Sequence, residues 1–133
     1  RQRLGCAHVT VVPYEEIGRS EKGPFDAILL DVPCSNTGVL ARRVEARYRV
    51  RSDSIRQLAQ TQLTLLEKAA ALLADDGRIC YSTCSIQKVE NGDLVRQFLS
   101  AGARFDLIHE ELTLPTAREW DHDGAYAAIL QRR

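Results

Sequence analysis

The sequence has no methionine, one tryptophan and few aromatic residues (6%), and its 18 basic residues are balanced by 18 acidic ones. A net charge of zero gives no overall electrostatic signal for nucleic acid or membrane as a partner. The apolar runs are only a few residues long, which excludes a transmembrane helix. The first residues also lack the apolar stretch and cleavage site of a signal peptide. Because residue 1 is not methionine, we expect the chain to be a piece of a longer protein.

The four cysteines indicate a reducing environment. None has the CxxC spacing of a zinc site, and three follow or lie within apolar, strand-like segments. Free thiols are typical of the cytoplasm, so we expect a cytoplasmic protein without a bound metal. The length of 133 residues and the hydrophobic content of 44% fit one domain spanning residues 1–133.

The hydrophobic pattern alternates between strands and helices. Strands are predicted at 8–12, 25–31, 78–82, 103–108 and 125–130, and helices at 54–74 and 89–100, with Asp75-Asp76-Gly77 ending the first helix. Strands separated by helices are typical of a parallel α/β sheet. The last two strands have no helix between them, which predicts a hairpin and an antiparallel edge.

Two apolar strands run directly into turns that contain cysteine, at residues 28–38 and 78–86. In a parallel sheet, ligands bind beyond the carboxyl ends of the strands, and a right-handed crossover brings neighbouring strand ends to one edge. We therefore expect Cys34, Cys84 and Asp31 to face one pocket. The alternatives are that the cysteines are small buried hydrophobic residues, that Cys34 and Cys84 form a disulfide, and that Asp31 only caps a turn.

The residues of these turns resemble a known family. Residues 31–38, Asp-Val-Pro-Cys-Ser-Asn-Thr-Gly, resemble the DAPCSxxG motif of the RNA cytosine-C5 methyltransferases. Residues 81–85, Tyr-Ser-Thr-Cys-Ser, followed by Glu90 and Asn91, resemble the family's (S/T)TCS…EN motif, and Asp-Gly-Ala-Tyr at 123–126 is similar to its DGFF sequence. The resemblance covers about Arg3 to Leu130, and the likeness is to the bacterial 16S rRNA enzymes and their Nop2/Sun relatives.

This resemblance implies a Rossmann-like class I methyltransferase fold, and methylation of C5 of a cytosine in RNA, with 16S rRNA as the expected substrate. The methyl donor of the family is S-adenosylmethionine. By resemblance, the Cys84 thiolate attacks C6 of the cytosine, Cys34 assists release of the product, and Asp31 lies against both cofactor and base. DNA cytosine-C5 methyltransferases instead use a Pro-Cys cysteine, which leaves Cys34 as the alternative nucleophile.

Part of the family's cofactor site has no counterpart in the sequence. The family holds the cofactor with a Gly-rich loop after its first strand, and no such loop occurs here. We therefore expect the first two strands of the fold to be absent and the chain alone to be inactive. Glu15 is the nearest match to the family's acidic contact to adenine, with a solvated loop acid as the alternative. Without the first strand, the strand at 25–31 should expose an apolar edge that pairs with a second copy, or the strand at 8–12 should be displaced.

Arginines cluster after the first cysteine motif, at positions 42, 43, 47, 49, 51 and 56, diluted by Glu45 and Asp53. The resemblance places this loop beside the active site and implies that Arg42 and Arg43, with Asp31 and Pro33, contact the RNA. A solvated charged loop is the alternative interpretation. The alternative function is a domain that keeps the methyltransferase fold and binds RNA without catalysis.

Overall fold

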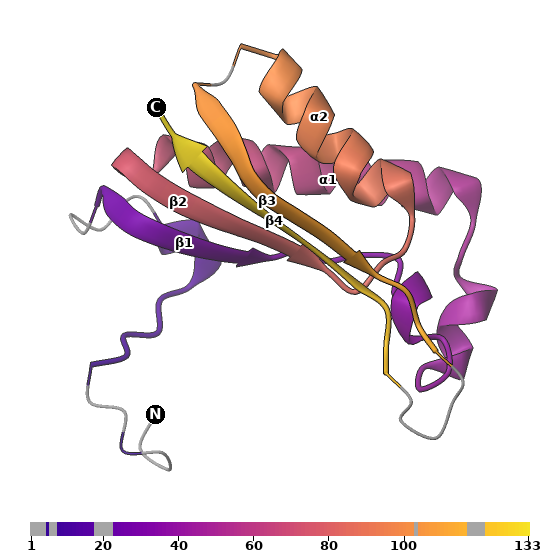
Figure 1. Cartoon of the computed structure of the whole chain (residues 1–133). Helices are drawn as coiled ribbons and strands as arrows, with labels where there is room; N and C mark the ends of the chain where they lie inside the picture. Colours follow the sequence, from indigo (N-terminus) through magenta and orange to yellow (C-terminus); the bar gives the residue numbers. More distant parts are fainter. Residues whose placement is uncertain (1–4, 6–7, 18–22, 103, 117–121) are drawn as a thin grey trace.

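The computed structural model describes residues 5, 8–17, 23–102, 104–116 and 122–133. The strands are β1 (Phe25–Asp31), β2 (Leu73–Thr83), β3 (Phe105–Thr113) and β4 (Ala125–Arg132), and the helices are α1 (Ser52–Ala71) and α2 (Gly92–Ser100). Short 3-10 turns occur at Tyr14–Glu16, Thr37–Val39, Val44–Tyr48 and Lys88–Glu90. Figure 1 shows the strands side by side, with both helices against the sheet.

The four strands form one mixed sheet in the order β1-β2-β4-β3. β1 and β2 are parallel, whereas β4 is antiparallel to both β2 and β3. The prediction of an α/β sheet with an antiparallel hairpin at its end is therefore confirmed. Because β1 and β2 are parallel and adjacent, the loops that follow them start from the same edge of the sheet.

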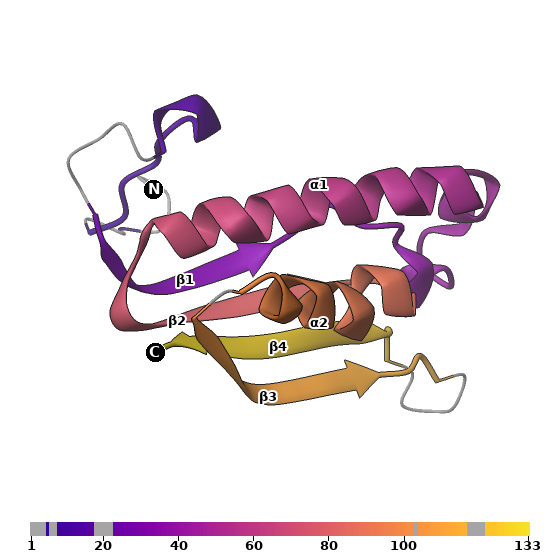
Figure 2. The ribbon, with the colours of Figure 1, turned by 90° about the horizontal axis from the view of Figure 1, so that it is seen from above.

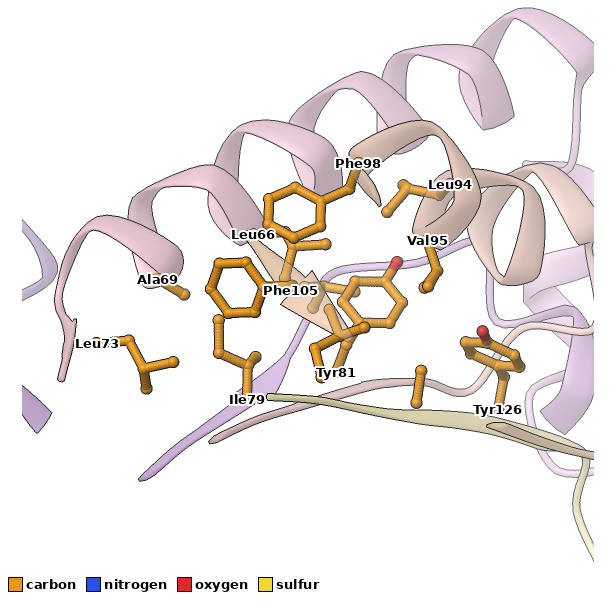
Figure 3. Close-up of a cluster of buried hydrophobic side chains, with 13 residues drawn as sticks. Leu66, Ala69, Leu73, Ile79, Tyr81, Leu94, Val95, Phe98, Phe105 and Tyr126 are labelled. Atoms are coloured by element: carbon orange, nitrogen blue, oxygen red, sulfur yellow. The ribbon is translucent and has the colours of Figure 1, made fainter. Parts of the chain in front are cut away.

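Both helices cover one face of the sheet, as the view from above shows (Figure 2). In β2, the side chains of Ile79, Tyr81 and Thr83 are buried and alternate with more exposed ones, as the two-residue period of a strand requires. The buried residues of α1, Gln62, Leu66 and Ala69, recur at helical spacing and face this sheet surface. Side chains from α2 and β4 complete the hydrophobic core between the helices and the sheet (Figure 3).

The predicted strand at 8–12 is wrong. Residues 8–13 have no regular secondary structure, and residues 8–17 are exposed. A strand is stable only when its backbone groups are paired, and none of the described strands pairs with this segment. β1 lies at the sheet edge, and the side chain of Leu29 is 74% exposed there. The prediction of an exposed apolar edge, with the segment 8–12 displaced, is thus confirmed.

The ends of several elements also differ from the predictions. Helix α1 ends at Ala71, and Leu73 already belongs to the sheet, so the sequence 75–77 does not end a helix. Instead, this sequence forms an irregularity in the pairing of β1 with β2, where the register shifts and Asp76 has φ +60°. The two strands approach closely there, because a Cβ at Gly77 would lie 3.1 Å from the carbonyl oxygen of Asp26. Strand β3 is longer than predicted because its pairing with β4 continues to Thr113. Ala103, the predicted first residue of β3, lies outside the described residues.

Helix α2 is shorter than predicted. A 3-10 turn precedes it, and the α-helix begins at Gly92. None of the described helices is both long and apolar enough to cross a membrane.

Candidate active site

The two motif cysteines meet where β1 and β2 end. Cys34 Sγ lies 2.9 Å from Cys84 Sγ, and both residues are free, half-buried cysteines. Asp31, the last residue of β1, accepts a hydrogen bond from Ser82 Oγ at 3.2 Å on the neighbouring strand. The three residues lie at one sheet edge, but they do not share the one pocket that the sequence predicts: Cys34 lines one hollow, whereas Cys84 and Asp31 line another. The buried-hydrophobe interpretation does not account for two thiols in contact at such an edge.

Backbone hydrogen bonds fix the two cysteine turns to each other. The Gly38 amide donates to the Cys84 carbonyl oxygen at 2.9 Å, and the Gly124 amide donates to the Gly38 carbonyl oxygen at 2.8 Å. A Cβ at Gly38 would overlap the Gly124 carbonyl and would lie 2.8 Å from the Cys84 carbonyl oxygen. Only glycine fits at this crossing, which explains why the first motif ends with it.

A buried carboxylate lies beneath the cysteines. The Glu90 side chain is fully buried and accepts hydrogen bonds from Ser35 Oγ and Ser85 Oγ at 2.5 Å each, from the Ser35 amide at 2.9 Å and from Gln62 Nε2 at 3.0 Å. Gln62 Nε2 also donates to the Pro33 carbonyl oxygen at 2.9 Å. Glu90 therefore contacts both residues that directly follow the cysteines.

Asn36 bridges the two cysteines. Its backbone is left-handed, with φ +59°, a conformation that asparagine tolerates better than most residues. Its Nδ2 donates to the Cys34 carbonyl oxygen at 3.0 Å, and its Oδ1 accepts from the Cys84 thiol at 3.0 Å. Asn36 therefore helps to hold the Cys84 sulfur beside that of Cys34.

The protonation of Cys34 is shifted by its surroundings. Burial, followed by the hydrogen bond with Cys84, raises the pKa of the Cys34 thiol to about 12. Cys34 therefore stays a neutral thiol at physiological pH and can donate its hydrogen bond to Cys84. A neutral thiol is a poor nucleophile but can donate a hydrogen bond.

The thiol pair lies between two hollows. Cys34 lines a cavity of about 520 Å³, walled by the turn at Val44–Tyr48 and by the first half of α1. Cys84 lines a second hollow of about 360 Å³ together with Asp31 and Ser82. The larger volume lies within the range of small-molecule binding sites.

The remaining predicted site residues take different positions. Arg43 lines the larger cavity, whereas Arg42 Nε pairs with Asp123 Oδ2 at 3.2 Å. Pro33 is exposed next to Cys34 and has its carbonyl held by α1. Glu15 lies beside Lys68 and Leu72, near the amino end of β1, and is not brought to the cysteines. Its contact with a cofactor stays a prediction.

The roles of three residues of the site were missed in the sequence. There, Gln62 is one polar position in a helix, Glu90 is only a member of the resembled motif, and Arg49 is one arginine among six. Arg49 lines the larger cavity opposite Cys34. A polar Gln on the apolar face of α1 is the one available signal, because a buried amide needs hydrogen-bond partners. Among the described residues, no cluster of three His, Cys, Asp or Glu side chains could hold a metal ion.

The family profile of the 16S rRNA methyltransferase RsmB/F matches residues 1–129. The chain belongs to this family. It is similar to the ribosomal RNA small subunit methyltransferase B of Vibrio vulnificus (strain YJ016), with 37% identity over 113 residues that cover 82% of the chain and 26% of that protein. The corresponding protein of Pseudomonas putida is 40% identical over 116 residues, which cover 80% of the chain and 27% of that protein. The chain thus spans about a quarter of the length of these relatives.

Solved structures share the fold. A methyltransferase homolog protein from Pyrococcus horikoshii has a TM-score of 0.67 and 25% identity, covering 89% of the chain and 42% of that protein. NSun6 from the same organism, solved with SFG, has a TM-score of 0.74 and 23% identity, covering 98% of the chain and 36% of that protein. The four-stranded sheet is accordingly part of a Rossmann-like methyltransferase fold.

Proposed function

We propose that the full-length protein containing this chain methylates C5 of a cytosine in ribosomal RNA, with 16S rRNA as the substrate and Cys84 as the nucleophile. The observation that carries the proposal is the contact of 2.9 Å between the thiols of the two motif cysteines at the carboxyl edge of β1 and β2. Membership of the RsmB/F family supports the RNA substrate.

The residues at this edge fit S-adenosylmethionine in one respect. The Asp31 carboxylate is exposed and is oriented by Ser82, and an exposed carboxylate is the natural partner of the cofactor's ammonium group. We therefore propose Asp31 as a cofactor contact, and Glu15 as a second one on the family resemblance alone. When bound, S-adenosylmethionine supplies an electrophilic methyl group.

The cysteines perform the covalent steps on the base. The Cys84 thiolate forms a bond to C6 of the cytosine, and the electrons of the C5–C6 double bond move to C5, which becomes nucleophilic. After C5 is methylated, a base from solvent accepts the C5 proton, the C–H electrons restore the C5–C6 double bond, and the S–C6 bond breaks with its electron pair staying on the Cys84 sulfur. The neutral Cys34 thiol, 2.9 Å away, assists this release by donating a hydrogen bond to the departing thiolate while keeping its own proton.

The positions of the two thiols favour Cys84 over Cys34 as the nucleophile. Cys84 lines the hollow that also contains Asp31, the proposed contact to cofactor and base. Cys34 is held as a thiol by its raised pKa. In the alternative assignment, Cys34 would have to lose the proton that its raised pKa retains.

Arginines of the larger cavity suit the RNA backbone. Arg43 and Arg49 line it next to Cys34, and guanidinium groups bind phosphate oxygens in a bidentate manner. We propose that these two residues, with Pro33 and with Arg42 at its ion pair, contact the RNA next to the target. The cytosine leaves its stack to reach Cys84. We also propose a cytoplasmic location, because the protein acts on ribosomal RNA and its motif cysteines are free thiols.

The test uses the full-length protein and RNA containing 5-fluorocytidine, in which fluorine at C5 blocks proton loss and traps the covalent adduct. Cys84→Ala is compared with Cys34→Ala, and the adduct is measured as a shift on a denaturing gel. We expect Cys84→Ala to abolish the adduct and Cys34→Ala to retain it.

Each other outcome refutes a stated part of the proposal. Loss of the adduct only in Cys34→Ala would reverse the roles of the two cysteines. If the wild-type protein binds the RNA but forms no adduct, the non-enzymatic RNA-binding function replaces methylation. In equilibrium RNA-binding titrations at several salt concentrations, Arg43→Gln with Arg49→Gln should lower RNA affinity and reduce the slope of the salt dependence by about 1 for each phosphate that is no longer neutralised.

A further inference from the structure

We propose that Glu90 is a positioning residue that sets the distance between the Cys34 and Cys84 thiols. The inference rests on the proposed function, because the chemistry of the two cysteines is what gives this distance its importance. Glu90 touches neither sulfur and acts through the residues that follow them.

The contacts of Glu90 span both cysteine turns. One carboxylate oxygen accepts from the Ser35 amide at 2.9 Å, and the other accepts from the hydroxyls of Ser35 and Ser85 at 2.5 Å each. Ser35 follows Cys34, and Ser85 follows Cys84. A single buried carboxylate therefore connects the residues next to the two thiols.

Glu90 is itself held from two sides. Gln62 of α1 donates to its carboxylate at 3.0 Å, and Tyr81 Oη donates to its backbone carbonyl at 2.6 Å. The side chain is 0% exposed, so no water competes for these hydrogen bonds. These residues pack between the helix and the sheet. The position of the Glu90 carboxylate is therefore fixed by the buried core and not by the exposed turns.

Removal of the Glu90 carboxylate should loosen the Cys34 turn more than the Cys84 turn. The hydroxyls of Ser35 and Ser85 lie 3.1 Å apart and can pair with each other. The Ser35 amide has no such substitute. Thr37 Oγ1 contacts both hydroxyls, that of Ser35 at 3.2 Å and that of Ser85 at 3.0 Å, but Ser85 also has a link outside the Cys34 turn, because Asn91 Nδ2 donates to its carbonyl oxygen at 2.8 Å. We therefore expect Cys34 to move away from a Cys84 that stays in place.

Disulfide formation measures this distance in the chain itself. Diamide takes the two thiol hydrogens and is reduced to the hydrazine while the Cys34–Cys84 bond forms. The rate depends on the effective concentration of one thiol at the other, which falls steeply when the two are misaligned. The experiment uses a Cys80→Ala background, since Cys80 and Cys84 lie on one tryptic peptide, and mass spectrometry of the peptides measures the cross-linked pair.

We expect Glu90→Ala to form this disulfide about tenfold more slowly than the parent. Glu90→Gln keeps the side-chain length and one acceptor oxygen, so it should rescue most of the rate. Leu130→Ala is the matched control, because Leu130 is also fully buried but lies in β4 away from both turns. Its rate should equal that of the parent under conditions where all variants are folded by circular dichroism.

An unchanged rate in Glu90→Ala, or an equal loss of rate in Leu130→Ala, would overturn the proposal. The result is independent of RNA chemistry. If the thiol test succeeds while the full-length protein forms no adduct with 5-fluorocytidine RNA, Glu90 positions the cysteines but the methylation function is refuted. If the adduct forms and the thiol test fails, the methylation function stands and the positioning role of Glu90 is refuted.

Discussion

The crossing of the two cysteine turns at Gly38 leads to a specific prediction for Gly38→Ala. The added methyl group would overlap the Gly124 carbonyl and would lie 2.8 Å from the Cys84 carbonyl oxygen. Gly38 sits in a 3-10 turn, so its backbone suits alanine and the cost is steric. Moving the crossing segments apart weakens two backbone hydrogen bonds, from Gly124 to Gly38 at 2.8 Å and from Gly38 to Cys84 at 2.9 Å.

The expected cost follows from these two effects. Overpacking costs about 1–3 kcal/mol, and two weakened hydrogen bonds add about 1 kcal/mol each. We therefore expect the free energy of unfolding to fall by about 3–5 kcal/mol, a large part of the stability of a small domain. Urea denaturation followed by circular dichroism measures the change.

The matched control is Gly102→Ala. Gly102 has φ +85° and no atom within 4 Å of the added Cβ, so this substitution costs only the backbone conformation, about 1–2 kcal/mol. If Gly38→Ala costs no more than Gly102→Ala, the steric argument is refuted. The same holds if diamide oxidises the cysteine pair of Gly38→Ala at the parent's rate.

Three further predictions concern other parts of the molecule. Folding raises the pKa of Cys34 from 9.0 to about 12, so between these pH values the folded chain keeps a proton that the unfolded chain loses. The free energy of unfolding should therefore fall as the pH rises from 9 to 12. Cys34→Ala should make that fall less steep in urea denaturation. Leu29→Lys should weaken self-association through the exposed edge of β1, where Leu29 is 74% exposed; a strictly monomeric parent in sedimentation at high concentration would refute such pairing. Gln62→Leu leaves the Pro33 carbonyl without its Gln62 donor and removes one of the donors to Glu90, which should cost about 2–4 kcal/mol in the same denaturation assay; a cost below about 0.5 kcal/mol would contradict it.

The part of the site that follows from strand geometry could be predicted from the sequence. Two adjacent parallel strands end at one edge, so apolar runs that lead into Cys34 and Cys84 suffice to bring the thiols together. The hairpin of β3 and β4 was equally predictable, because no helical segment separates the two strands.

The rest depends on partners that are distant along the chain. Glu90 reaches Ser35 across 55 positions, and nothing in the local pattern distinguishes a buried carboxylate from a helix cap. The segment 8–12 has a strand-like composition, but composition supplies no neighbour to pair with. Arg42 and Arg43 are adjacent in sequence, yet only their tertiary contacts separate an ion pair with Asp123 from a cavity wall.

The position of β4 has a consequence for the order in which the molecule can be completed. β4 comes last in the sequence but lies between β2 and β3, and β3 has no other partner among the described strands. Gly124, just before β4, also holds Gly38 in the first cysteine turn. Among the described strands, β3 therefore finds its partner only after residues 125–132 have been synthesised, and the contact between Gly124 and Gly38 also forms late. Loss of these eight residues would accordingly split the sheet and disable the cysteine pair, although both cysteines would remain.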